Sequence, residues 1–325
     1  MFSEKDELQI KNRGSELQTV LNRIENFKKG FPFLQIEEAA SIGDGIIKLD
    51  EKALEKSCAL YDKKVADGIK PLKFVPASGA ASRMFKALFE ALEECKKSDS
   101  PEEELINDKV VKQFIDQIEN FAFYNDLKNS IQKEKVEENC KNRVDYLLNE
   151  KGLNYGSLPK GLLKFHRYKT GERTPFEEHL VEGAEYSKDN QGVVQLHFTV
   201  SPDHQPVFEN LLNEIKEKYE KDLNVSFEVS FSQQKPSTDT IAVDLKNEPF
   251  RELDGRLLFR PGGHGSLIEN LNDLNADVVF IKNIDNVVPD KLKQATVEYK
   301  KALAGVLLKY QEKLFIYQKE LNEKH

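Results

Sequence analysis

The sequence changes character at residues 72–84, which read Leu72-Lys73-Phe74-Val75-Pro76-Ala77-Ser78-Gly79-Ala80-Ala81-Ser82-Arg83-Met84. An apolar run comes first, and a series of small residues follows it up to Arg83. Apolar residues then recur at helical spacing, at Phe85, Leu88, Phe89 and Leu92. The stretch therefore predicts a strand, a loop of small residues and a helix.

Strands and helices alternate in the second half of the chain. We expect strands at residues 193–200, 225–231, 240–243, 257–260 and 277–281, and helices at residues 207–219 and 266–274. Such alternation is typical of a mostly parallel sheet with helices on both faces. The sequence therefore predicts an α/β fold.

The remaining parts of the chain favour helices. Apolar residues follow a helical period within residues 1–70, and again within a charged segment at about 98–155. The last 35 residues resemble one long helix. We therefore expect an N-terminal helical region at 1–70, an α/β domain at 71–290 that carries a helical insert at 98–155, and a long helix at 291–325.

Composition narrows the range of partners. The 325 residues include 48 Lys and Arg against 56 Asp and Glu, so the net charge is −8. Duplex DNA selects basic surfaces, and we expect no nucleic-acid partner. The charged stretch Met1–Glu7 does not resemble a secretory signal, and no apolar run reaches the roughly 20 residues of a membrane helix. We expect a cytoplasmic protein with no membrane partner, and its oligomeric state stays open.

The loop Ser78–Ser82 is the first candidate site, with Ser78, Gly79, Ala80, Ala81 and Ser82 as its residues. Small side chains let backbone N–H groups approach phosphate oxygens, and a helix N-terminus adds positive charge. Arg83 can bridge two phosphate oxygens with its planar guanidinium. A tight turn with a surface arginine is the alternative. The loop lacks the Gly-Lys-Ser/Thr ending of a Walker A motif and the three glycines of the dinucleotide fingerprint.

Further candidates stand on loops. Lys160 lies between Pro159 and Gly161, which fix it as a point charge for a phosphate oxygen, although a plain surface lysine fits too. Gln233 follows a predicted strand and can contact a base or a hydroxyl group. We interpret Thr174-Pro175 and the acidic residues after it as an ordinary helix start.

The last two candidates follow the strands at 257–260 and 277–281. Gly262, Gly263 and His264 form a glycine-rich corner, a pattern that favours unusual backbone angles or a ligand close by. Asp285 stands at the end of an apolar strand and can hold Mg²⁺ on a phosphate. Ordinary turns are the alternative for both. The other histidines, His179 among them, show no metal-ligand spacing.

In this order, four stretches resemble motifs of the nucleotide-sugar pyrophosphorylases, in particular the branch of the UDP-glucose and UDP-N-acetylglucosamine enzymes. Residues 78–84 are similar to the family's Gly-x-Gly-Thr-Arg-Met loop, and residues 159–163 to its Pro-Lys-Gly motif. Residues 261–266 resemble its Pro-Gly-His-Gly-Asp loop, with Ser266 in place of Asp, and residues 283–286 its Asn-x-Asp-Asn strand end. The resemblance covers about 71–290 and suggests a bacterial branch of the superfamily. It implies a Rossmann-like GT-A nucleotidyltransferase fold.

The resemblance also implies a reaction. A nucleoside triphosphate, with UTP favoured, and a sugar 1-phosphate would give a nucleotide-sugar and pyrophosphate, with Mg²⁺ as cofactor. Arg83 and Lys160 would neutralise the phosphates, Asp285 would hold the metal, and the loop residues, Gln233 and the glycine-rich corner would bind the nucleotide. We expect Arg83, Lys160, His264 and Asp285 around one cleft. The family's late acidic metal partner is not visible here, so a non-catalytic nucleotide or nucleotide-sugar binding protein is the main alternative. Nucleotidyl transfer to a non-sugar phosphate is a third.

Overall fold

The protein is described by a computed structural model that covers residues 2–97, 103, 105 and 107–323. The chain divides into two compact units, one of Met1–Lys56 with Ser232–Asn275 and one of Ser57–Phe231 with Ala276–His325. The predicted range 71–290 therefore contributes to both units, because its residues 232–275 group with the N-terminal region. We describe each unit by itself.

The larger unit contains a four-stranded sheet in the order β10-β3-β6-β7, formed by β10 (Val278–Ile281), β3 (Pro71–Pro76), β6 (Val193–Thr199) and β7 (Ser226–Ser232). β3 runs parallel to both β10 and β6, and Phe74 is paired with Ile281 on one side and His197 on the other. Side-chain hydrogen bonds join Gln195 to Glu228 and His197 to Ser230. Both pairs are 33 residues apart in the chain, so the two strands advance in the same direction and β7 is parallel to β6. The predicted α/β fold with a parallel sheet is confirmed for these four strands.

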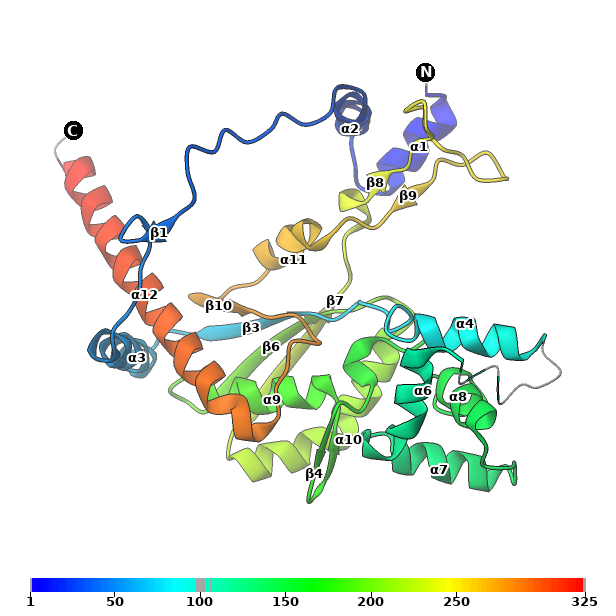
Figure 1. The fold of residues 1–325 in the computed structure, drawn as a ribbon. Helices are drawn as coiled ribbons and strands as arrows, with labels where there is room; N and C mark the ends of the chain where they lie inside the picture. Colours follow the sequence, from blue (N-terminus) through cyan, green and yellow to red (C-terminus); the bar gives the residue numbers. More distant parts are fainter. Residues whose placement is uncertain (1, 98–102, 104, 106, 324–325) are drawn as a thin grey trace. The chain divides into compact units, whose positions relative to one another are not determined.

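Helices of the larger unit pack on one face of this sheet (Figure 1). α9 (Pro175–Tyr186) and α10 (Gln205–Leu223) bury Phe176 and Phe208 against Val75 and Phe198 of the strands. α3 (Glu51–Ala66) and α12 (Asp290–Glu323) enclose a second cluster around Phe280 of β10. The opposite face carries Leu72, Phe74, Gln195 and His197, among other residues. The helices of this unit that pack on the sheet thus lie on one face, and Leu72, Phe74 and His197 on the other face are buried as well.

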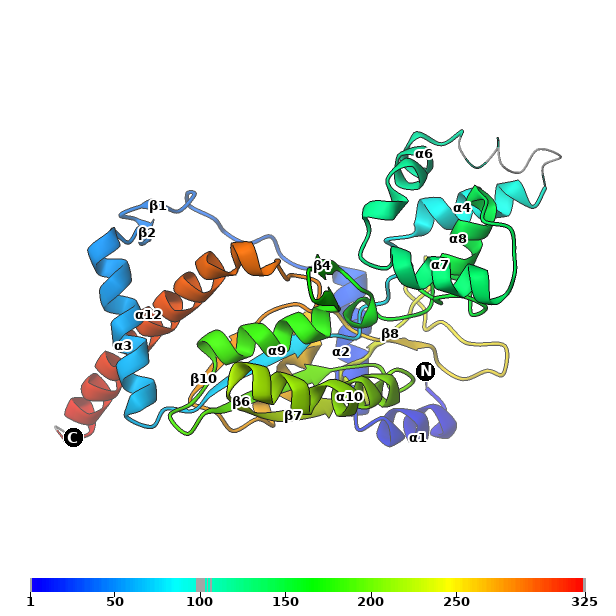
Figure 2. The same ribbon diagram turned by 90° about the horizontal axis from the view of Figure 1, so that it is seen from below.

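A helical insert separates β3 from α9 (Figure 2). It consists of α4 (Lys86–Cys95), α6 (Lys109–Asp116), α7 (Tyr124–Lys133) and α8 (Cys140–Leu148). These helices share a hydrophobic core that includes Leu92, Val111, Leu127 and Leu147. The insert therefore begins earlier than the predicted residue 98, because the apolar face of α4 belongs to the same core. Of the predicted insert, residues 98–102, 104 and 106 lie outside the described residues.

The smaller unit contains α1 (Glu4–Asn12) and α2 (Leu17–Lys29), packed around Ile10, Val20 and Ile241. The strands predicted at 240–243 and 257–260 are β8 (Thr240–Ile241) and β9 (Phe259–Arg260), and they pair antiparallel with each other. The prediction that they join the parallel sheet is wrong, because a local hairpin satisfies their backbone groups. Hydrogen bonds from Ala242 to Leu258 and from Leu258 to Phe250 extend that pairing.

Short elements complete the chain. They are β1 (Ser41–Ile42), β2 (Gly45–Ile46), η1 (Ile118–Asn120), η2 (Lys160–Leu162), β4 (His166–Tyr168), β5 (Gly171–Arg173), η3 (Pro236–Thr238), η4 (His264–Leu267) and α11 (Ile268–Asn272). Residues 30–50 lie between α2 and α3 and form no helix, so helix does not fill the predicted range 1–70. Among the described residues, no helix is long and apolar enough to cross a membrane.

Candidate functional site

The strand order places a reversal point next to β3. The chain moves from β3 to β6 and β7 on one side, and then returns to form β10 on the other side of β3. This is the order of the first four strands of doubly wound folds, in which ligands bind outside the carboxyl ends of the strands where the order reverses. The carboxyl ends of β3 and β10 therefore mark the expected crevice.

Three segments meet at this edge. The Lys160 N–H donates to the Gly79 carbonyl oxygen at 3.1 Å, and the Ala81 N–H donates to Leu158 at 3.3 Å. The ammonium group of Lys160 lies 2.5 Å from a carboxylate oxygen of Asp285 in the turn after β10. The structure thus brings together the loop after β3, the start of η2 and Asp285, all within the larger unit.

The loop after β3 offers free backbone donors. In the described chain, the N–H groups of Gly79, Ala80 and Ser82 make no hydrogen bond, and these residues are exposed. Arg83 is exposed too, but it lies in the turn before α4, which begins only at Lys86. The loop N–H groups and the Arg83 side chain remain able to contact an anion.

Gly161 explains how Lys160 reaches Asp285. Lys160 begins the short 3-10 helix η2 and does not lie in a loop. Gly161, the second residue of η2, is buried. A Cβ atom at Gly161 would lie 2.9 Å from Ile284 Cγ1 and equally close to the ring of Phe208. Contacts below 3.0 Å force a displacement. Only glycine lets η2 lie this close to the turn that carries Asp285.

His179 supports the same turn, a role that no pattern in the sequence indicated. It is fully buried on α9, and its Nε2 atom lies 3.2 Å from the carbonyl oxygen of Asn283 and 3.1 Å from that of Ile284. Because both partners are acceptors, Nε2 must carry the proton. Burial, together with the charges of Lys73 and Lys282, lowers the pKa of His179 well below its ordinary value. A neutral histidine therefore holds the two residues before Asp285.

Glu182, on the same helix as His179, forms a buried ion cluster with Lys73 of β3 and Lys282, which follows β10. The Glu182 carboxylate accepts hydrogen bonds from Lys282 at 2.8 and 2.9 Å and from Lys73 at 3.1 Å. Burial lowers the pKa of Lys73 to about 7, against the opposing effect of Glu182. Burial alone would raise the pKa of the Glu182 carboxyl, but the two ammonium groups lower it overall. Lys73 interrupts the apolar run of β3, and this was the feature of the sequence that could have indicated the buried ion cluster.

The four other predicted nucleotide contacts belong to the smaller unit. Gln233 accepts a hydrogen bond from Asn270 through its backbone carbonyl at 2.8 Å. His264 is exposed at the start of η4. A Cβ atom at Gly262 would lie 2.0 Å from the Ser266 hydroxyl oxygen, so a tight turn already accounts for this glycine. The roles predicted for Gln233, Gly262, Gly263 and His264 stay predictions.

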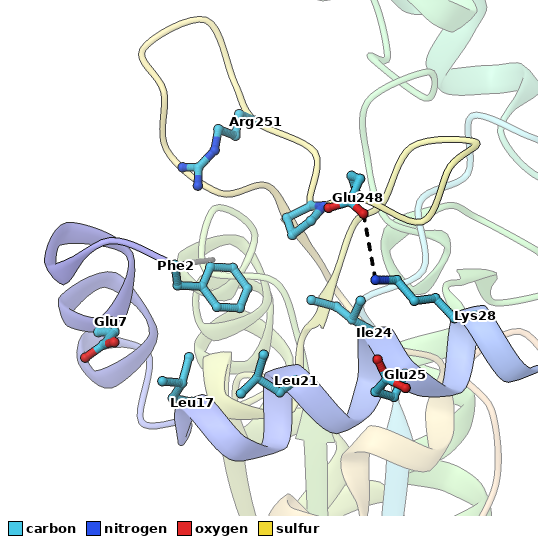
Figure 3. Close-up of a pocket in the computed structure, with 10 residues that line it drawn as sticks. Phe2, Glu7, Leu17, Leu21, Ile24, Glu25, Lys28, Glu248 and Arg251 are labelled. Carbon is cyan, nitrogen blue, oxygen red and sulfur yellow. Dashed lines mark ion pairs between the residues drawn. The ribbon is translucent and has the colours of Figure 1, made fainter.

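Two cavities are lined by apolar residues. One, of about 340 Å³, lies in the larger unit beside the loop after β3, and its lining includes Met84, Phe85, Phe114, Phe123 and Tyr155. The other, of about 460 Å³, lies in the smaller unit, where Phe2 and apolar residues of α2 face Glu248 and Arg251 (Figure 3). The first cavity adjoins Arg83 directly in the chain. The second contains none of the predicted site residues.

Comparison with known proteins gives a family. Neither the curated proteins nor the solved structures include a match to this chain. One family model, described as a domain of unknown function (DUF4301), matches residues 3–325. Since this range includes nearly the whole sequence, the chain belongs to the DUF4301 family.

Proposed function

We propose that this protein is a nucleotidyltransferase that joins a nucleoside triphosphate, with UTP favoured, to a sugar 1-phosphate and releases pyrophosphate. The observation that carries the proposal is the meeting of the loop after β3, Lys160 and Asp285 at the strand-order reversal of a parallel sheet. Backbone donors and two cations at such an edge suit a chain of phosphates.

The proposed reaction depends on positioning and charge. An oxygen of the sugar 1-phosphate attacks the α-phosphorus of the triphosphate, the bond to the β-phosphate oxygen breaks, and pyrophosphate leaves with the bonding electrons. The N–H groups of Gly79, Ala80 and Ser82 would hold the nucleotide phosphates. Arg83 and Lys160 would neutralise the charge that builds up on the departing pyrophosphate. No side chain needs to abstract a proton, because the attacking phosphate oxygen is already ionised.

Mg²⁺ is part of the proposal, with Asp285 as its protein ligand. The described residues contain no group of three or more His, Cys, Asp or Glu side chains placed to hold a metal. A single carboxylate still fits, because Mg²⁺ on a nucleotide takes one or two carboxylates and completes its shell with phosphates and water. The Asp285 side chain is 35% exposed and so can reach such a partner. When bound, the ion would supply further neutralisation of the phosphates, and Lys160, released from Asp285, would contact a phosphate oxygen.

The test is release of pyrophosphate from UTP and glucose 1-phosphate in the presence of Mg²⁺, followed by panels of other triphosphates and sugar phosphates. Lys160→Met and Arg83→Gln should each lower kcat/KM by about 10²-fold or more, the scale for a lost charge-stabilising group. Lys86→Met is the matched control, since Lys86 is an exposed cation at the start of α4. Equal turnover in all three variants would contradict the proposal.

Two other functions are favoured by particular observations. The ion pair between Lys160 and Asp285 already satisfies both side chains, which suits a non-catalytic nucleotide or nucleotide-sugar binding protein. Thermal stabilisation by UDP-glucose without turnover would identify that case. The aromatic cavity next to Arg83 suits nucleotidyl transfer to a phosphate acceptor that carries an apolar group instead of a sugar. A panel that includes aryl and alkyl phosphates separates this reaction from the first.

A further inference from the structure

The C-terminal half of α12 is a helix without a covering layer. The buried residues of α12 end at Leu308, and every described residue from 309 to 323 is exposed except the half-buried Gln311. These last turns continue beyond the sheet of their own unit (Figures 1 and 2). The packed first half of α12 already nucleates the helix, so these turns can form without a partner, but they expose several large apolar side chains. An exposed apolar surface of this kind is typical of an interaction site.

One stripe of this helix carries large apolar side chains at a strict repeat. Their spacing alternates between four and three residues, and each is between 47% and 64% exposed: Leu303, Leu307, Tyr310, Leu314, Tyr317 and Leu321. We call these six residues the α12 seam. A repeat that averages 3.5 residues keeps one apolar line facing a partner helix that winds around it, as in a two-stranded coiled coil.

Apart from Phe315 and Ile316, the residues of 309–323 that lie away from the α12 seam are polar. Lys309, Glu312, Lys319 and Glu323 are exposed around the rest of the helix, and Lys319 and Glu323 form an ion pair at 3.8 Å. This distribution fits a helix that buries one line of side chains and leaves the other faces in water. It fits less well with burial of the helix inside a larger core.

We propose that the part of the α12 seam from Tyr310 to Leu321 pairs with the same part in a second copy of this chain, as an antiparallel two-stranded coiled coil. The charged residues beside the seam favour a second copy of this chain as the partner and an antiparallel direction of pairing. Lys313 and Glu320 flank the seam at equivalent positions one heptad apart. Antiparallel pairing sets Lys313 of one copy opposite Glu320 of the other, and symmetry makes this ion pair twice. Parallel pairing instead sets Lys313 opposite the neutral Gln318.

Side-chain size agrees with the same register. With Lys313 opposite Glu320, Leu314 of one copy faces Tyr317 of the other, and Tyr310 faces Leu321. Each layer then combines a leucine with a tyrosine. A parallel arrangement would stack tyrosine on tyrosine in two layers, which leaves two phenolic hydroxyl groups to be accommodated in each.

The first experiment measures the mass of the full-length chain by sedimentation velocity over a range of concentrations. The wild type should form a dimer, and Leu314→Lys should raise the dissociation constant at least tenfold. Ile316→Lys is the matched control, because Ile316 is 50% exposed on the same helix but lies off the seam, and it should leave the dimer intact. Far-UV circular dichroism of each variant verifies that the rest of the chain is folded.

Two results would overturn the proposal. One is a wild type that stays monomeric at all concentrations; if Leu314→Lys then also lowers its stability, the seam is covered by the protein's own chain, for example by the exposed apolar residues near Phe33. The other is an equal effect of Leu314→Lys and Ile316→Lys on the dissociation constant.

A charge exchange tests the direction of pairing. Lys313→Glu and Glu320→Lys should each raise the dissociation constant severalfold, because each sets like charges opposite one another twice. The double variant with both changes should restore the wild-type dissociation constant. A double variant that dissociates as readily as the single ones would refute the antiparallel arrangement. None of these outcomes depends on the proposed enzymatic activity.

Discussion

Replacing Glu182 by glutamine tests how strongly the buried ion cluster supports the sheet edge. Glu182 is fully buried, and its carboxylate is the counter-charge for both Lys73 and Lys282, of which the first is fully buried and the second 8% exposed. The amide of glutamine has nearly the same size but no charge. The variant therefore leaves two ammonium groups facing each other without an anion between them.

The structure sets the size of the effect. Removing one partner of a buried ion pair costs about 3–5 kcal/mol. The pKa of Lys73 is already lowered to about 7, so Lys73 can lose its proton with little further cost near pH 8. One unpaired charge, on Lys282, then remains. We therefore expect a loss near the lower figure, about 3 kcal/mol, which is a large part of the 5–15 kcal/mol typical of a folded domain.

Urea unfolding followed by far-UV circular dichroism measures this loss, since the chain has no tryptophan for fluorescence. Glu185→Gln is the control, because Glu185 is exposed on the same helix, and it should change the free energy of unfolding by no more than about 0.5 kcal/mol. A Glu182→Gln variant that differs from this control by less than about 1 kcal/mol would refute the reasoning, since removal of a buried partner must cost more than a surface change.

Two further predictions concern Lys73 and Gly161. The pKa of Lys73 is about 7 in the folded protein and 10.5 in the reference state, so between these pH values the unfolded chain binds more protons and the folded state gains stability as pH rises. From pH 7 to pH 9 the wild type should gain about 2.3 kcal/mol over Lys73→Met in urea unfolding, and a difference that stays constant with pH would show that Lys73 keeps its proton. Gly161→Ala should push η2 away from Ile284 and separate Lys160 from Asp285. It should lower pyrophosphate release about as much as Lys160→Met does, and normal activity in a folded Gly161→Ala protein would show that the close approach is dispensable.

Local pattern was sufficient to predict several parts of the fold. The apolar run before Ala77, the small residues after it and the helical spacing that follows correspond to β3, its loop and α4. The apolar stretch before Asn283 corresponds to β10 in the same way. In each case the residues that make the element are neighbours in the chain, so their order alone carries the information.

Tertiary pairing could not be predicted in the same way. The residues near Ile241 and Phe259 have the composition of strands, but nothing in their order says that they pair with each other instead of joining the sheet. His179 and Glu182 differ from surface residues only through contacts with Lys282 and the turn after β10, about 100 positions away in the chain. The resemblance to pyrophosphorylases predicted that Lys160 and Asp285 share a cleft, but no spacing rule in the sequence predicts their direct contact, because they lie so far apart in the chain.

The helical insert begins and ends at neighbouring points of the larger unit. Ala81 and Leu158 are joined by a hydrogen bond, and α4, α6, α7 and α8 lie between them in the chain. Because its two ends are in contact, this segment can be shortened, lengthened or exchanged without displacing the strands of the sheet. The insert can therefore be exchanged as a unit. Arg83 and Lys160 lie near its two ends in the chain. A rocking motion of the insert would change the separation of Arg83 and Lys160, and under the proposed function it would alter their contacts with the phosphates.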